Sequence, residues 1–355
     1  MSDLVLYYYI LDIWSFGYMY YLLVGAAILL FGGQFFVNGR YQMRCGASLL
    51  SSTVLSLGTG IAGALCLFFV NGCSLHSTPF TLLMAFFFAM SGIFLNLFGV
   101  YALGRASLSL YSAFTMIGGM IVPSVVGMIF FDEQLTWNKA VCYVLTLLGL
   151  SLTVKKEKGA KSFFIYFGVF LCNGASAAIS TVFAKAEYAK AASADYSTLC
   201  AAWKAVVALA ILPVAVRLFR RAEKSAEKPE IPAESAGDAA RNGTLPSVPE
   251  STASSLSASR KESLVRKYTS PLVLLFLLLG GTLNTVANFF LPVAMRDGGL
   301  DGSVVYPMIT GGVMIVSTVL GFLNLRKPTR REVLAVIICS LGILFLIVPA
   351  LLGGS

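Results

Sequence analysis

Ten long apolar blocks follow one another along this 355-residue chain and constrain its fold more than any other feature. Each has roughly 17 to 24 residues, enough for a helix to cross a hydrocarbon core about 30 Å thick. Runs such as Val333–Leu352 are apolar on every face, whereas a membrane β-strand alternates. The chain is therefore predicted to be an all-α integral membrane protein with ten transmembrane helices, over residues 18–38, 47–70, 80–102, 108–131, 138–154, 163–184, 197–216, 271–294, 303–324 and 333–351.

Composition indicates the same solvent. Hydrophobic residues make up 57% of the chain and charged residues only 12%, whereas soluble domains carry about 25% charged residues. The formal net charge of +9 does not predict a nucleic-acid partner, because the Lys and Arg residues lie mostly in loops beside the spans, where membrane orientation explains them. His76 is the single histidine, which argues against a His-based metal site. We expect neither a metal nor a cofactor.

The loops, each numbered by the span that it follows, differ in basic residues. Nearly all Lys and Arg residues lie in the odd-numbered loops, and the even-numbered loops hold only Lys139, Lys185, Lys190 and Arg296. Because cytoplasmic loops are enriched in Lys and Arg, the odd loops are predicted to be cytoplasmic and both termini to lie on the opposite side. The expected location is the plasma membrane of a bacterial cell. The seventh loop, residues 220–268, is rich in Ala, Ser, Glu and Pro, which predicts disorder.

Two parts of the chain resemble each other. NLFGVYALGR from Asn96 aligns with NFFLPVAMR from Asn288, and GGMIVPSVVG from Gly118 aligns with GGVMIVSTVLG from Gly311 with one inserted residue. Each half, residues 1–158 and 159–355, then contains five spans. Because five is odd, the second half crosses the membrane in the opposite sense, which gives the inverted five-helix repeats common in secondary transporters. Chance similarity among apolar helices is the alternative.

Three stretches carry a resemblance to a known family: LLFGGQFFVNGRYQ, NLFGVYALGRASLSLYSAF and GMIFFDEQLTWNKAVCYVLTLLGLSLTV. They are similar to the EamA-type, ten-helix branch of the drug/metabolite transporter superfamily, and the resemblance covers nearly the whole chain except the seventh loop. It implies export or uptake of metabolites, amino acids, nucleotide sugars or drugs. The chain departs from the family in two respects. Arg326 and Lys327 stand where the first half carries two acidic residues, and family members usually keep both termini in the cytoplasm.

Polar side chains inside the predicted spans are the candidates for a solute site, since such residues are costly in lipid and usually face a cavity. Lys204 is the one charge well inside a span, and we predict that it binds an anionic solute. Snorkelling of its long stem to the interface is the alternative. Members of the family often have a basic residue early in this helix. No Asp or Glu lies inside a predicted span, which disfavours proton coupling through a carboxylate at the midplane.

Amides and aromatic hydroxyls extend this predicted substrate site. Asn96 and Asn288 occupy matching repeat positions, and Asn284 lies one turn before Asn288, so facing helices present donors and acceptors. Hydrogen bonding between helices is the alternative for these amides. Tyr111 and Tyr306 are near-equivalent in the fourth and ninth spans and offer a ring with a hydroxyl group. Simple packing is the alternative for each tyrosine.

Two weaker candidates, Gln34 and Ser176, lie in the spans that open the two halves. Together the residues predict a secondary transporter that moves a small polar metabolite, such as an amino acid, a sugar or nucleotide derivative or an organic anion, by alternating access. Its expected partners are this solute and membrane lipids. A flippase for a lipid-linked substrate is the alternative. An enzyme with Ser176 as nucleophile is less favoured, because the single histidine lies in a loop and no base is near.

Overall fold

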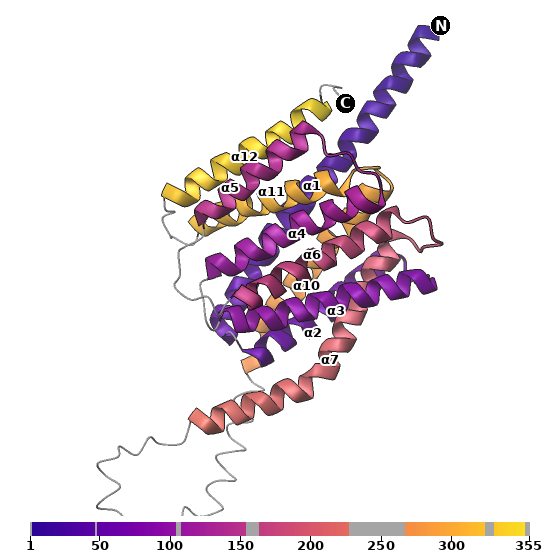
Figure 1. Cartoon of the computed structure of the whole chain (residues 1–355). Coiled ribbons are helices and arrows are strands. Elements are labelled where there is room, and N and C mark those ends of the chain that lie inside the picture. The colour runs from indigo at the N-terminus through magenta and orange to yellow at the C-terminus, as the bar shows by residue number, and fades with distance from the viewer. Residues whose placement is uncertain are drawn as a thin grey trace, which may run out of the picture.

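The computed structural model describes residues 2–46, 48–103, 108–153, 163–226, 267–323 and 330–351. Side chains are described within these ranges except at residues 2–18, 99–103, 108–113, 153, 163, 223–226, 321–323, 332 and 349–351. The described chain forms ten α-helices and no β-strand (Figure 1). The helices are α1 (Ser2–Cys45), α2 (Leu49–Val70), α3 (Pro79–Leu103), α4 (Leu108–Phe130), α5 (Trp137–Thr153), α6 (Phe163–Lys185), α7 (Ser193–Ala226), α10 (Pro271–Arg296), α11 (Gly302–Leu323) and α12 (Arg330–Leu351).

These helices confirm the predicted all-helical fold, and each predicted apolar block coincides with one of them. Two helices extend well beyond their blocks. α1 begins at Ser2, and α7 continues beyond residue 216 to Ala226. The second extension is rich in Arg, Ala, Glu and Lys, which keep helix propensity high after the apolar part has ended. The predicted start of the disordered loop at residue 220 is therefore wrong, and residues 227–266 of that loop lie outside the described residues.

Within the described residues, seven helices contain a stretch long and apolar enough to cross a membrane: Met19–Cys45, Leu49–Val70, Pro79–Phe98, Phe164–Lys185, Ser193–Ala222, Pro271–Arg296 and Gly302–Leu320. The described apolar stretches of α4, α5 and α12 are shorter, at Phe114–Phe130, Trp137–Leu152 and Val333–Val348. Large apolar side chains point outward, with Leu22 exposed by 73%, Phe69 by 65% and Ile129 by 66%. Lipid tails solvate such a surface, whereas water does not. The chain is therefore an integral membrane protein.

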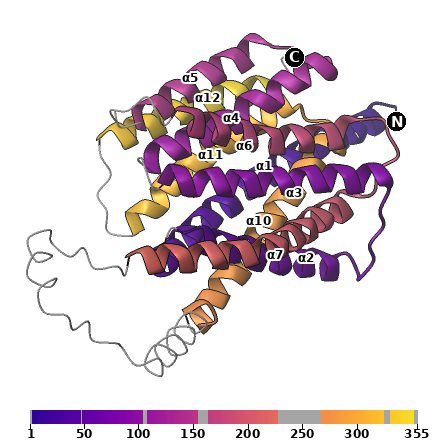
Figure 2. The ribbon, with the colours of Figure 1, turned by 60° about the horizontal axis from the view of Figure 1, so that its bottom comes forward.

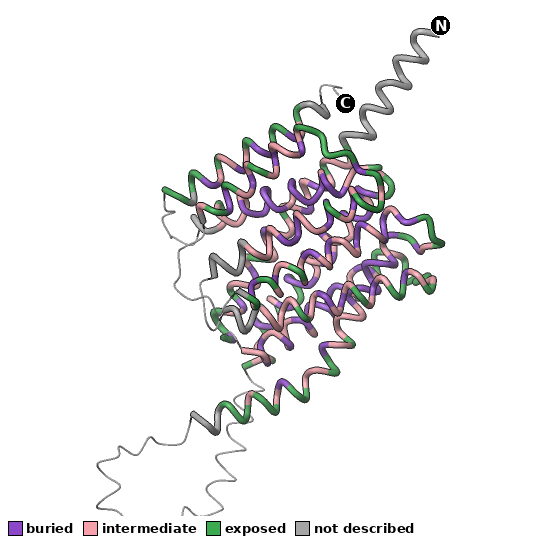
Figure 3. Tube along the Cα trace, viewed as in Figure 1, coloured by how far each residue is buried: buried purple, intermediate pink, exposed green. Residues whose placement is uncertain are grey.

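The strongest packing joins helices that are distant in sequence. α2 packs on α7, α4 on α6, α1 on α10, and α5 on α12. Further contacts join α3 with α6, α2 with α10, α1 with α11, α3 with α7, and α4 with α11. In Figures 1 and 2, α5 and α12 lie together at one edge of the bundle, while α2 and α7 lie at the opposite edge. Buried positions gather between these edges, and the last turns of α7 are mostly exposed (Figure 3).

Two of these contacts depend on the absence of a side chain. A Cβ atom at Gly60 of α2 would lie 2.8 Å from the backbone nitrogen of Ala205 and 2.9 Å from the carbonyl oxygen of Ala201 on α7. A Cβ atom at Gly118 of α4 would overlap the carbonyl group of Phe170 on α6. Small residues allow helices to approach this closely, which is how helices associate in lipid without a hydrophobic driving force.

Four connecting segments lie at one end of the bundle, where α1 begins and α12 ends (Figure 1). They are residues 71–78, 131–136, 186–192 and 297–301, the even-numbered loops of the sequence, and we call this end the even-loop end. Hydrogen bonds join these segments to neighbouring elements: Asn71 Nδ2 donates to Asp195 Oδ1 at 2.8 Å, and Arg296 donates to the carbonyl oxygen of Ala191 at 2.7 Å. The opposite end of the bundle is called the odd-loop end.

Candidate functional site

Lys204 of α7 lies about halfway between the two ends of the bundle. Its Nζ donates to Thr59 Oγ1 of α2 at 3.2 Å, and its side chain is partly exposed. Thr59 stands about halfway between Leu49 and Val70, the two ends of α2. The ammonium group is therefore at mid-depth, and the snorkelling alternative does not describe this conformation. The contact exists because α2 and α7 approach closely at Gly60, the residue next to Thr59.

Two hydroxyl groups on α2 connect Lys204 to one of the predicted amides. Ser56 precedes Thr59 by one helical turn, and Thr59 Oγ1 donates to the carbonyl oxygen of Leu55 at 2.7 Å. Asn96 Nδ2 on α3 donates to Ser56 Oγ at 2.5 Å. A polar track therefore runs from α3 across α2 to α7. Sequence reasoning missed Ser56 and Thr59; the signal was present as two hydroxyl residues one turn apart, beside two glycines on the same helix.

The predicted amides of α10 lie at a similar depth. Asn288 Nδ2 donates to the carbonyl oxygen of Asn284 at 2.8 Å and to its Oδ1 at 3.1 Å. Both side chains are partly exposed. A Cβ atom at Gly281, one turn before Asn284, would lie 2.6 Å from the carbonyl oxygen of Thr59. α10 thus meets α2 at the level of the Lys204 contact.

The remaining predicted residues are more dispersed. Ser176 Oγ donates to Ser91 Oγ at 3.0 Å and to the carbonyl oxygen of Cys172 at 3.2 Å. Tyr306 is buried, and its hydroxyl group donates to the carbonyl oxygen of Ala177 at 2.8 Å, so this contact engages the group expected to face a solute. Gln34 lies partly exposed on α1. The side chain of Tyr111 lies outside the described residues, although its backbone belongs to α4.

The charge of Lys204 is not neutralised by a described carboxylate. In the described ranges, no Asp or Glu oxygen is recorded within 4.0 Å of Lys204 Nζ. Asp195 belongs to the same helix but lies in its first turn, at the even-loop end, where it accepts a hydrogen bond from Asn71. A cation at mid-depth with only a hydroxyl partner is costly in a low-dielectric environment, and an anion would offset that cost. The site is therefore suited to a negatively charged group.

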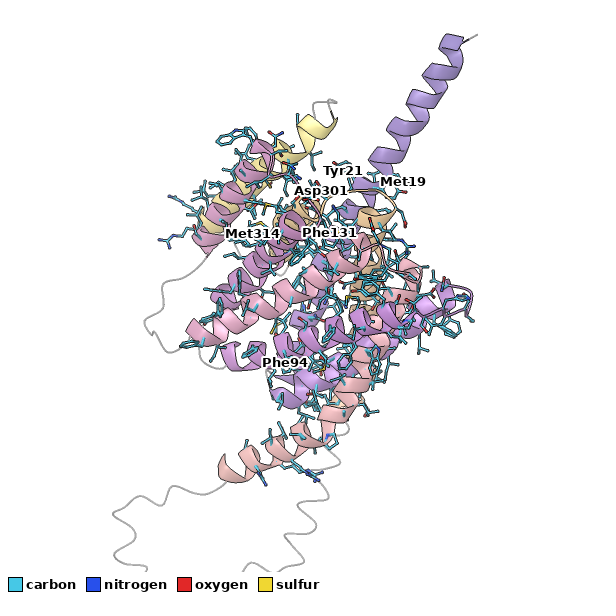
Figure 4. The ribbon with its side chains drawn as sticks, turned by 45° about the vertical axis from the view of Figure 1, so that its right-hand side comes forward. Met19, Tyr21, Phe94, Phe131, Asp301 and Met314 are labelled. Atoms are coloured by element: carbon cyan, nitrogen blue, oxygen red, sulfur yellow. The ribbon has the colours of Figure 1, made fainter. Side chains whose placement is uncertain are left out.

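A second polar group lies at the even-loop end, where Figure 4 labels Asp301, Phe131 and Tyr21. Lys185 Nζ is 2.6 Å from Glu133 Oε1 and 2.8 Å from Asp301 Oδ1. Lys139 Nζ is 2.8 Å from Asp301 Oδ2. The side chains of Glu133 and Lys139 are 1% and 8% exposed. We call Glu133, Lys139, Lys185 and Asp301 the end cluster. The sequence predicts that Glu133 and Asp301 lie outside the spans, but it does not predict that Glu133 is buried.

The two lysines of the end cluster change the pKa of Asp301, which contacts both of them. Burial acts to raise the pKa of Asp301, but hydrogen bonds from Lys139 and Lys185 and the charges of these two lysines outweigh that effect. The pKa of Asp301 therefore lies below its ordinary value, and the carboxylate stays charged at neutral pH.

Comparisons with known proteins bear on the fold of the chain. No family model matches the sequence, and no curated protein matches it. One solved structure, described only as the crystal structure of a protein, aligns with 94% of this chain and 98% of its own length, at a TM-score of 0.61 and 14% identity. At that identity the likeness shows the fold alone. The fold and the apolar helices together define the class, a polytopic α-helical membrane protein.

Proposed function

We propose that this protein is a secondary transporter that moves a small polar metabolite, with Lys204 binding a negatively charged group of the solute. The observation that carries the proposal is the Lys204 ammonium at mid-depth, partnered by Thr59 and by no described carboxylate. Hydroxyl and amide groups of Ser56 and Asn96 continue the polar surface from there. In lipid, ionisable side chains at this depth mark solute pathways.

The packing pattern supports ten spans arranged as two inverted halves. Exchanging α1 with α6, α2 with α7, α3 with α10, α4 with α11 and α5 with α12 converts the main contacts of the bundle into one another. The α4–α6 contact becomes α11–α1, the α1–α10 contact becomes α6–α3, and the α2–α10 contact becomes α7–α3. The pairs α2–α7, α4–α11 and α5–α12 are unchanged. This exchange is the signature expected of a two-fold axis between the halves.

The direction of the helices supports inversion rather than a parallel repeat. Asn71 follows the end of α2 and contacts Asp195 in the first turn of α7, while Gly60 at mid-helix meets residues 201–205. The two helices therefore run antiparallel, and a two-fold axis that exchanges them lies in the membrane plane. Inverted halves provide two related conformations, open to opposite sides, which is the basis of alternating access.

Orientation and family belong to the same proposal. Described basic residues at the odd-loop end include Arg40, Arg44, Arg217 and Arg330, and the enrichment of such residues beside cytoplasmic ends supports a cytoplasmic odd-loop end. We place the chain in the EamA-type branch of the drug/metabolite transporter superfamily on the strength of the quoted sequence stretches.

A ligand screen tests the proposal. The detergent-purified chain is heated with carboxylates, phosphate esters, amino acids, sugars, organic cations and lipids, because a ligand that binds the folded state raises the melting temperature by mass action. A hit is then tested by counterflow in proteoliposomes. An anionic hit that exchanges across the bilayer, and is lost in Lys204→Ala but kept in Arg217→Ala, supports the transporter. Stabilisation by lipids alone, with no exchange of any soluble hit, favours the flippase instead.

A further inference from the structure

The end cluster joins the two halves of the chain by ion pairs. Glu133 and Lys139 belong to the first half, whereas Lys185 and Asp301 belong to the second. Both the Glu133–Lys185 pair and the Lys139–Asp301 pair therefore cross the boundary between halves. The four residues alternate in sign, so each inner charge has an oppositely charged neighbour on both sides.

Local backbone geometry holds Glu133 in the cluster. α4 ends at Phe130, and Asp132 adopts φ of 53°, a left-handed conformation that turns the chain back toward the helix. The backbone nitrogen of Glu133 then donates to the carbonyl oxygen of Gly127 at 3.2 Å. The carboxyl group lies against Gly127, where a Cβ atom would be 2.6 Å from Glu133 Cδ. The carboxylate faces Lys185 of α6 and the start of α11.

The Glu133 carboxylate also caps α11 of the other half. The backbone nitrogens of Gly302 and Ser303 donate to Glu133 Oε1 and Oε2, each at 2.9 Å. These are the first two residues of α11, whose N–H groups have no partner within the helix and whose positive dipole end favours an anion. Tyr143 of α5 donates to the carbonyl oxygen of Ser303 at 3.0 Å, which adds another bond between the halves.

The sequence provides no matching carboxylate at the odd-loop end. In the repeat, the hairpin that carries Asp132 and Glu133 corresponds to the hairpin between α11 and α12, and that hairpin carries Arg326 and Lys327. A basic side chain repels the positive end of a helix and is unable to accept its N–H bonds. The cap made by Glu133 therefore has no chemical counterpart in the second hairpin.

We propose that the end cluster is a one-sided latch, which closes the solute pathway at the even-loop end and leaves this conformation to receive solute from the odd-loop end. The inference rests on the proposed alternating access. A cavity of about 580 Å³ lies outside the cluster, and Lys185 forms part of its wall together with Asp132, Glu187 and Arg296. In this proposal, solute moves between the even-loop end and the Lys204 site only after the Glu133–Lys185 and Lys139–Asp301 pairs separate.

Cysteine accessibility in the full-length chain tests the latch without requiring an identified solute. Cys73 is exposed at the even-loop end and serves as the sidedness reference, and the other native cysteines are replaced by alanine. The substitution Asn288→Cys supplies a reporter thiol inside the bundle. Sealed vesicles of known orientation are treated on one side with a membrane-impermeant maleimide. In the latched parent, the reporter thiol is expected to react from the even-loop side at least tenfold more slowly than Cys73.

Glu133→Gln removes the charge and replaces one accepting oxygen by a donor, so labelling of the reporter thiol from the even-loop side is expected to accelerate about tenfold. Asp132→Asn is the matched control, because Asp132 is exposed on the same loop and Asn tolerates the same left-handed conformation. If Glu133→Gln does not elute as a folded species, Lys139→Gln, which leaves the Glu133 contacts intact, is measured in its place. Labelling that is equal in the latch variant and in Asp132→Asn overturns the latch.

The two proposals fail in different ways. If Glu133→Gln opens the even-loop side but no solute exchanges in counterflow, the latch stands and the transport function fails. If solute exchange depends on Lys204 while the reporter thiol reacts equally fast from the even-loop side in the parent and in every latch variant, transport stands and the latch is wrong.

Discussion

Lys204 of α7 and Thr59 of α2 are 145 positions apart in the sequence, yet their side chains meet at 3.2 Å, about halfway along α2. The contact explains how an ammonium group is held at mid-depth. The backbones of α2 and α7 lie close together at Gly60. The Lys204 side chain therefore lies beside α2, and its ammonium group donates to the Thr59 hydroxyl group. Under the proposed function, this ammonium group binds the negatively charged group of the solute.

Replacing this lysine tests the site directly. Lys204→Ala is expected to weaken binding of the anionic solute by roughly 10- to 100-fold, because a hydrogen bond to a charged group contributes about 1.5–3 kcal/mol. Lys204→Arg keeps the charge and should retain part of the affinity. Arg217→Ala, an exposed change on the same helix, should leave affinity unaltered. Calorimetric titration of the screened solute measures all three, and equal affinity in Lys204→Ala and Arg217→Ala would refute the assignment.

The Thr59 hydroxyl should matter through the lysine that it positions. Thr59→Val keeps the side-chain shape, removes the partner of Lys204, and is expected to reduce solute affinity severalfold, in line with a hydrogen bond of about 1 kcal/mol. Thr53→Val is the matched control, since Thr53 is also buried in α2 and donates to the carbonyl oxygen of Leu49 at 2.8 Å. A comparable loss of affinity in both variants would show that Thr59 acts only on the helix itself.

Helix packing gives a prediction that is independent of any ligand. Gly60→Ala places a methyl group against the backbone of α7 and is expected to destabilise the fold by about 1–3 kcal/mol. Gly25→Ala in α1 meets no atom within 4 Å, and should be neutral or stabilising by up to about 1 kcal/mol. Thermal unfolding in detergent distinguishes the two. Equal melting temperatures would mean that α2 and α7 are not in the described contact.

Acid should weaken the even-loop end through Asp301. The lowered pKa of Asp301 means that its charged form is favoured in the folded chain, so its contribution to stability is present above the unfolded value of about 4 and is lost as pH falls through the folded pKa. Melting temperature measured from pH 7 to pH 3 should therefore fall more steeply below about pH 4 in the parent than in Asp301→Asn. Parallel curves would contradict this assignment.

The all-helical fold and the position of each helix along the chain were predictable because each helix satisfies its own backbone hydrogen bonds and needs only an apolar stretch of sufficient length. The ends of α1 and α7 were not, because both helices continue beyond their apolar parts. Lys204 was predictable for a related reason, since a charge inside an apolar block is conspicuous in the sequence. The residues that surround Lys204 were less predictable. Ser56 and Thr59 are common residues in membrane helices, and only the α2–α7 and α2–α3 contacts give them a role.

The local sequence thus determined which segments are helices and which charge lies inside an apolar block. The tertiary structure alone decided which helices touch, because lipid solvates every apolar face equally and periodicity does not select a neighbour. It also decided that the Glu133 side chain is buried and accepts hydrogen bonds from Gly302 and Ser303 of the other half. Those contacts join residues about 170 positions apart, a distance over which no local pattern carries information.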